Sequence, residues 1–220
     1  MNLKTEYRNQ LPHIAPIGAC FFVTFRLADA LPQAVVKELR YSMLEEINRL
    51  KKEQPVDYKQ RIKDARKKFF GQYDHQLDVL KYGACYLERP EIAKIITGRL
   101  HELDGKYYDL IAYSIMPNHV HVLFDTSIQV VDDDNFYLDE APDNYVQLNQ
   151  IMKLIKGSTA TYANRLLGRN GKFWQKDSFD HYVRTEREFE NIISYILNNP
   201  VKAGLVEAWD QYPYSYLRKS

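Results

Sequence analysis

The sequence predicts an α+β fold in which helices flank an antiparallel sheet. Three features support this prediction: an early strand-like segment, a series of amphipathic helical segments, and two strand-like segments close together in the chain. The order strand, helices, strand, strand is typical of this class. With 220 residues, of which 45% are hydrophobic, the chain can bury a sizeable core. We expect one domain, spanning residues 1–220, with additions.

The first half of the chain supplies one strand and two helices to this prediction. Residues 19–27, ACFFVTFRL, are rich in β-branched and aromatic side chains and predict a strand. Residues 31–54 predict a long amphipathic helix, because Pro32 marks its start and apolar residues recur at helical spacing as far as Leu50. A second, basic helical segment surrounds residues 61–70.

The middle of the chain supplies a third helix and the two adjacent strands. Residues 89–103 predict a helix with Pro90 near its start and apolar residues on one stripe. Residues 107–116 and 119–124 both read as strands, and the Pro-Asn pair between them is a natural turn. These two strands are therefore expected to pair antiparallel.

The last helix is predicted over residues 185–199. Thr185 is a good N-cap residue, and Pro200 is expected to end the helix. At 3.6 residues per turn the isoleucines gather on one face. The opposite, polar stripe consists of Glu188, Asn191, Tyr195, Asn198 and Asn199. A tyrosine that served only packing would more naturally lie among the isoleucines, so Tyr195 is a candidate for chemistry.

The alternating segment YSIMPNHVHVLF contains the candidate metal ligands. Residues two apart in a strand point to the same face, so His119 and His121 are expected to project side by side. Two imidazoles on one face can bind one metal ion. Asn199, one helical turn after Tyr195, could add its amide oxygen.

Charge and cysteine content limit the class of protein. The net charge of +1 gives no overall basic field, so any nucleic-acid surface must be local. Cys20 and Cys85 lack CxxC spacing, which favours a reducing compartment and excludes a structural zinc site. The N-terminal residues have no signal-like apolar core, and no segment is long enough to span a membrane. We therefore expect a cytoplasmic protein.

Two neighbouring segments differ strongly in charge. Residues 125–145 carry many acidic and no basic side chains, and are expected to form an acidic, solvated loop. Residues 147–176 carry no acidic side chain, and their basic residues are interleaved with Tyr162, Phe173 and Trp174. Basic and aromatic side chains together are used by single-stranded nucleic-acid binders. The alternative is a solvated basic helix with Trp174 in the core.

These motifs together resemble the His-hydrophobic-His (HUH) single-tyrosine transposases. MPNHVHVL, residues 116–123, resembles the HUH motif, and YILNNPVKAGLV, residues 195–206, is similar to the tyrosine-helix signature of the REP-associated branch. Further matches are FFVTFRL (21–27), LIKGSTATYANRLLGRNGKFWQ (154–175) and SFDHYVR (178–184). The resemblance covers nearly the whole chain. It implies a ferredoxin-like antiparallel sheet flanked by helices, with a C-terminal helix that bears the tyrosine.

The resemblance also implies an activity: metal-dependent transfer of single-stranded DNA. In this family a tyrosine attacks a phosphodiester and leaves a 5′-phosphotyrosine link and a free 3′-hydroxyl. Carried onto this chain, Tyr195 is the nucleophile, and His119, His121 and Asn199 hold Mg²⁺ or Mn²⁺. The family commonly uses Gln where this chain has Asn199.

Several assignments within the site remain open at this stage. Glu188 or Asn191, on the same stripe, could replace Asn199 as the third ligand. Tyr182 is the rival nucleophile, and His181 beside it is a candidate proton carrier.

By analogy with the REP-associated branch, the expected partner is a single-stranded DNA hairpin formed by a repeated palindrome. The expected contacts to its phosphates and bases are Lys153, Lys156, Arg165, Arg169, Lys172, Trp174 and Arg184. The sequence leaves open whether two chains pair as a homodimer. Two other functions also remain: a metal-dependent nuclease that uses water instead of tyrosine, and a DNA-hairpin-binding module without catalysis.

Overall fold

The structure is a computed structural model, and it describes residues 6–8, 12–131 and 141–219. The chain divides into two compact units. One consists of residues 1–28 and 86–220, and the other of residues 29–85. The single domain expected from the sequence stays a prediction, because compactness alone does not define a folding unit.

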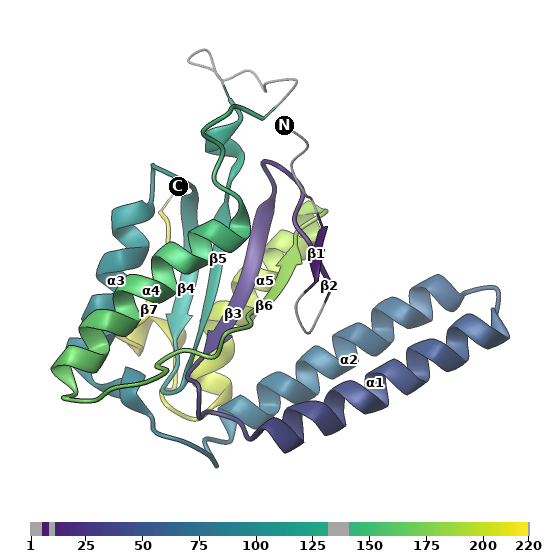
Figure 1. The fold of residues 1–220 in the computed structure, drawn as a ribbon, viewed down its shortest axis with the longest axis horizontal. Coiled ribbons are helices and arrows are strands. Elements are labelled where there is room, and N and C mark those ends of the chain that lie inside the picture. Colours follow the sequence, from purple (N-terminus) through teal and green to yellow (C-terminus); the bar gives the residue numbers. More distant parts are fainter. Residues whose placement is uncertain (1–5, 9–11, 132–140, 220) are drawn as a thin grey trace. The chain divides into compact units, whose positions relative to one another are not determined.

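The larger unit is built on a five-stranded antiparallel sheet with the strand order β6-β3-β5-β4-β7 (Figure 1). Its strands are β3 (Cys20–Arg26), β4 (Asp109–Ile115), β5 (His119–Asp125), β6 (Phe179–Tyr182) and β7 (Ser215–Leu217). A separate two-stranded sheet pairs β1 (Glu6–Arg8) with β2 (Pro12–Ile14). The predicted α+β class with an antiparallel sheet and flanking helices is confirmed.

The register of β3 and β5 determines which side chains share a face. Thr24 pairs with His121 and Phe25 pairs with Val120. Since neighbouring residues in a strand point to opposite faces, the histidine side chains share one face with Thr24, while Phe25 and Val120 lie on the other. The two faces are covered by different helices.

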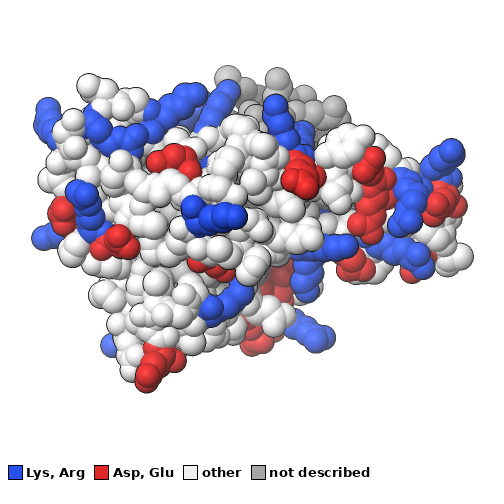
Figure 2. All heavy atoms as spheres, turned by 90° about the horizontal axis from the view of Figure 1, so that it is seen from below, with Lys and Arg blue, Asp and Glu red and all other residues white. Residues whose placement is uncertain are grey.

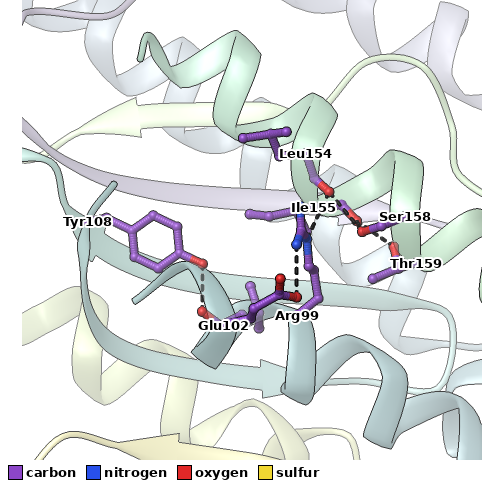
Figure 3. A network of polar contacts seen from close by, with 8 residues as sticks. Arg99, Glu102, Tyr108, Leu154, Ile155, Ser158 and Thr159 are labelled. Atoms are coloured by element: carbon purple, nitrogen blue, oxygen red, sulfur yellow. Dashed lines mark hydrogen bonds and ion pairs between the residues drawn. The ribbon is translucent and has the colours of Figure 1, made fainter. Parts of the chain in front are cut away.

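Helices α3 (Pro90–Leu103) and α4 (Leu148–Leu166) lie on one side of the sheet and α5 (Glu186–Lys202) lies on the other (Figure 1). Figure 3 shows how α3 is fixed to α4: Arg99 donates from Nε to the carbonyl of Leu154 at 3.1 Å and pairs with Glu102 at 2.8 Å. Three short 3-10 helices, η1 (Tyr86–Glu88), η2 (Ser127–Gln129) and η3 (Trp209–Gln211), lie in the connections.

The smaller unit is a helical hairpin made of α1 (Gln33–Glu53) and α2 (Tyr58–Asp78). Gln54 takes a left-handed conformation with φ 44° at the end of α1, and its N–H donates to the carbonyl of Leu50. The apolar stripe predicted for α1 is buried at Met43, Ile47 and Leu50.

The structure corrects the predicted end of the last helix. Pro200 lies inside α5, which continues to Lys202 and is followed by Gly204 with φ 70°. A proline lacks the N–H that an interior helical position donates, but the N–H groups of later residues still close the turn, as when Ala203 donates to Asn199 at 2.9 Å. Pro200 therefore weakens the last turn without ending the helix.

Most acidic side chains of the predicted loop, residues 125–145, fall on residues 132–140, which lie outside the described residues. Of the acidic side chains assigned to it, Asp125 is instead the last residue of β5. In the part of the chain that the structure describes, no helix combines the length and the apolar character required to cross a membrane.

Candidate metal and tyrosine site

The histidine pair has the geometry that the strand alternation predicts. His119 and His121 project from β5 to the same face of the sheet, and both side chains are buried. Their Nε2 atoms lie 3.0 Å apart. The ring of Phe22, on the neighbouring strand β3, stacks on His121 with ring centroids 5.7 Å apart. The two imidazoles thus have little freedom to separate.

Each imidazole is oriented by a hydrogen bond at its other nitrogen. Nδ1 of His119 lies 2.6 Å from Oδ1 of Asn118, and Nδ1 of His121 lies 2.7 Å from Oγ1 of Thr24. An amide oxygen only accepts, so His119 carries its proton on Nδ1, and a threonine hydroxyl can accept in the same way. Both Nε2 atoms then present lone pairs, which is the arrangement used by histidine metal ligands.

Asn199 approaches His121 from helix α5, which covers the histidine face of the sheet. Its Nδ2 lies 2.9 Å from Nε2 of His121, and its side chain is buried. Its Oδ1 has no hydrogen-bond partner among the described residues, which is costly for a buried polar atom. Exchanging the two amide atoms by a half-turn of the amide group would direct that oxygen at the histidines.

The three residues fit a divalent cation. In an octahedral shell with bonds of about 2.1 Å, neighbouring ligand atoms lie about 3.0 Å apart. The separations of 3.0 Å between the Nε2 atoms and 2.9 Å from His121 to the Asn199 amide match that spacing. Two lone pairs facing each other at 3.0 Å also repel unless a proton or a cation lies between them. The chemistry of His119, His121 and Asn199 therefore suits a metal site.

Tyr195 lies beside this cluster. It projects from α5, half-buried, with its ring 5.4 Å from the ring of His121 and 5.8 Å from that of Phe22. Asn199 follows it by one helical turn, so both residues face the histidine side of the sheet. The helix stripe that the sequence identifies as polar is in this region directed at the sheet.

Tyr182, the alternative nucleophile, lies elsewhere. It is on β6 and pairs with Phe21, so its side chain projects to the sheet face opposite that of the histidines. The guanidinium carbon of Arg184 lies 4.0 Å from the centre of its ring. Among the two tyrosines, only Tyr195 is near the histidine pair.

Glu188 is engaged in bonds of its own. Oε1 accepts from Nε2 of His181 at 2.8 Å, and Oε2 accepts from the backbone N–H of Arg184 at 2.8 Å. Burial opposes ionisation of this carboxyl, but these two bonds outweigh it and hold its pKa below the ordinary value. Asn191, the other alternative ligand, is exposed. Neither competes with Asn199 for the histidines.

The Glu188 contacts connect β6 to the start of the tyrosine-bearing helix, and Glu188→Gln tests their strength. A carboxyl whose pKa is lowered by folding stabilises the protein above its unfolded pKa, and this stabilisation is lost as the pH falls through the folded value. We expect Glu188→Gln to lower the free energy of unfolding by about 1 kcal/mol at pH 7. In urea unfolding, the variant should be less stable than the wild type at pH 7 but not at pH 3. An equal loss of stability at both pH values would contradict this account.

The basic residues of α4 differ in exposure and do not form one continuous surface. Lys153 and Arg165 are exposed. Lys156, in contrast, donates from Nζ to the carbonyl of Lys176 at 2.8 Å and to Oγ of Ser178 at 3.1 Å. Burial lowers the pKa of the Lys156 ammonium to about 8, even though Asp177 favours its charged form. Lys156 therefore serves mainly to fix the segment that follows α4.

The structure corrects the predicted role of Trp174. Its side chain is buried, its Nε1 donates to Oγ1 of Thr159 at 2.9 Å, and its ring packs edge-on against Phe25 at 4.8 Å. An indole enclosed in this way has no free face for a base. The alternative that placed Trp174 in the core is the correct one.

The other predicted contacts are distributed over the surface. Lys172 and Arg184 are exposed and Arg169 is half-buried. Figure 2 shows lysine and arginine side chains gathered in places on one face, with acidic side chains between them elsewhere. This pattern agrees with a net charge of only +1.

Sequence reasoning missed two residues that position the site. Asn118 directly precedes His119, so the motif PNHVH could have indicated it as a partner of the imidazole. Thr24 could not have been found, because it meets His121 only through the pairing of β3 with β5. A single sequence does not determine that register.

No family model matches the chain. A protein of Haemophilus influenzae named "Putative REP-associated tyrosine transposase" is 31% identical over 108 residues, which is 49% of this chain and 58% of that protein. A structure described as a REP-associated tyrosine transposase bound to a REP hairpin aligns with a TM-score of 0.45 and 18% identity, over 96% of this chain and 81% of that chain. The sequence match agrees with the resemblance that the motifs predict: about half of this chain is similar to that protein, and the chain spans 58% of its length.

Proposed function

We propose that the protein is a metal-dependent single-stranded DNA transposase that cleaves and rejoins DNA at hairpin repeats. One observation carries the proposal: His119, His121, Asn199 and Tyr195 converge on one face of the sheet. The relative named as a REP-associated tyrosine transposase supports the choice of substrate. The match covers 49% of this chain and 58% of the relative, so the inference of the substrate rests on about half of each protein.

The chemistry assigned to Tyr195 is an in-line attack on a phosphodiester. Its phenol oxygen forms a bond to phosphorus, the bond from phosphorus to the 3′-oxygen breaks, and the phenol proton is lost as the leaving oxygen gains one. The product is a 5′-phosphotyrosine link and a free 3′-hydroxyl. Because the link conserves the phosphodiester energy, a 3′-hydroxyl can reverse the step without a nucleotide cofactor.

His119, His121 and Asn199 would hold the Mg²⁺ or Mn²⁺ ion beside the tyrosine. When bound, such an ion stabilises the negative charge that develops on the phosphate oxygens. Asn118 and Thr24 would keep the imidazoles in the tautomer whose Nε2 atoms carry lone pairs. The half-buried position of Tyr195 limits the directions from which its oxygen can approach a phosphate.

The proposal is tested with labelled single-stranded hairpins taken from the repeats that flank the gene. The protein is incubated with them and Mn²⁺ or Mg²⁺, and the products are separated on a denaturing gel. A labelled, metal-dependent species that survives denaturation is expected. Cleavage without such an adduct would indicate a nuclease that uses water, and a hairpin that is bound but uncut would indicate a binding module.

Asn199→Ala tests the third ligand. We expect this change to weaken Mn²⁺ binding by about tenfold or more, because it removes an amide oxygen that can face the imidazole of His121. Asn198→Ala is the matched control, since Asn198 is exposed and donates to the carbonyl of Ser194 at 2.8 Å. Isothermal titration with Mn²⁺ measures both. Equal affinities for the two variants would exclude Asn199 from the metal site.

A further inference from the structure

A second cluster of residues lies at one end of the same sheet and comes from two separate segments of the chain. Arg89 and Arg169 both approach the ring of Tyr86, with their guanidinium carbons 5.9 Å and 5.0 Å from its centre. The ring of Phe173 stacks on Tyr86 at 6.3 Å, and Phe173 itself is buried. We call Tyr86, Arg89 and Arg169 the arginine–tyrosine cluster. The buried ring of Phe173 thus holds Tyr86 in place, and two guanidinium groups lie beside the Tyr86 ring.

In the part of the chain that the structure describes, these two positive charges lie outside any ion pair. Among the described residues the one side-chain hydrogen bond of Arg169 goes to the carbonyl of Lys172 at 3.4 Å. Lys172 and Arg89 are exposed, which adds to the positive field. Like charges gathered on one ring repel each other unless an anion joins them. The cluster is therefore suited to an anionic ligand.

Backbone hydrogen bonds connect the cluster to the strand that carries the histidines. Leu87, next to Tyr86, donates to the carbonyl of Pro117 at 3.1 Å, and Leu27 donates to the carbonyl of Asn118 at 2.9 Å. Ala28 in turn donates to the carbonyl of Phe173 at 2.9 Å. The turn before His119 and the segments that carry the cluster are thus joined at one end of the sheet.

We propose that the arginine–tyrosine cluster binds the phosphates of the single-stranded DNA that flanks the hairpin. This inference rests on the proposed function and names a contact surface for its substrate. A guanidinium can bind a phosphate through two parallel hydrogen bonds, and holding it on a tyrosine ring reduces the entropy lost on binding. Of the residues expected from the sequence to contact DNA, Arg169 is a member of the cluster and Lys172 is its neighbour, whereas Tyr86 and Arg89 are new.

The experiment measures binding without cleavage. In the Tyr195→Phe background, fluorescence anisotropy compares a hairpin that carries a single-stranded flank with the same hairpin without it, over a range of salt concentrations. The test variant is Arg89→Gln with Arg169→Gln. Arg66→Gln is the control, because Arg66 is an exposed arginine of the helical hairpin and its loss lowers the net charge by one unit, as each single substitution does. Each single substitution is measured as well.

The double substitution should weaken binding of the flanked hairpin by about tenfold or more at moderate salt, because two phosphate contacts are lost. The slope of log affinity against log salt should fall by about 1.4, at about 0.7 for each contact to a single strand, and each single variant should give about half of that change. Binding of the hairpin without a flank should be unchanged.

Equal weakening of both hairpins, or no weakening beyond that of Arg66→Gln, would overturn the inference. Failure of this binding-surface inference can be distinguished from failure of the proposed transposase function. The binding assay needs no chemistry, so an absent adduct with a flank-specific effect of the arginines would reject the chemistry and keep the surface.

Discussion

Tyr195→Phe is expected to abolish the covalent protein–DNA adduct and to slow strand cleavage by at least about 10⁴-fold, as removal of an enzyme's nucleophile commonly does. The change deletes one oxygen and leaves the ring, whose contacts with Phe22 and His121 hold it in place. Folding and metal binding should therefore be unchanged. The measurement is the rate of adduct formation on a labelled hairpin, with circular dichroism as a check on the fold.

Tyr182→Phe is the matched control for this prediction. Tyr182 loses the same oxygen but projects to the other face of the sheet, where it packs against Arg184. It should retain adduct formation within about threefold, because surface substitutions away from a site have small effects. If Tyr182→Phe removes the adduct and Tyr195→Phe does not, the assignment of the nucleophile is wrong.

His119→Ala is expected to have the largest effect on metal binding. Loss of even an outer-shell partner of a metal ligand costs about 10- to 100-fold in affinity, so loss of a ligand should exceed about 100-fold. Nε2 of His119 lies 3.0 Å from that of His121, so both imidazoles can bind the same ion. Electron paramagnetic resonance of free Mn²⁺ during titration gives the affinity directly.

His101→Ala is the control for this loss. His101 is exposed and contacts the hydroxyl of Tyr113, whose pairing with Val122 places it on the face away from the histidine pair. Its removal should leave Mn²⁺ binding unchanged. Activity that persists in His119→Ala without added metal would contradict the role assigned to the histidine pair.

The sequence predicted the parts of the site that depend on local periodicity. Alternation along β5 placed His119 and His121 on one face, and helical spacing placed Tyr195 and Asn199 on one stripe of α5. Which surface that stripe would meet was not predictable, because it depends on the pairing of strands far apart in the chain. The meeting of Asn199 with His121, 78 residues away, is of this kind.

Other elements lacked a signal strong enough for sequence reasoning. Strand β6 has four residues and β7 has three, too few for an alternating pattern to stand out. The basic and aromatic composition of residues 147–176 suggested base stacking by Trp174. Its ring is buried and therefore cannot stack on a base. Arg89 lies outside that segment and meets Arg169 only through Tyr86.

The central claim is that Tyr195 forms the covalent bond to DNA, and mapping the adduct tests it most directly. The wild-type protein is incubated with a hairpin and Mn²⁺, digested with protease, and the nucleotide-linked peptide is sequenced by mass spectrometry. The account predicts a single modified residue, Tyr195, linked to a 5′-phosphate. Modification of another tyrosine, or cleaved DNA with no modified peptide, would contradict it.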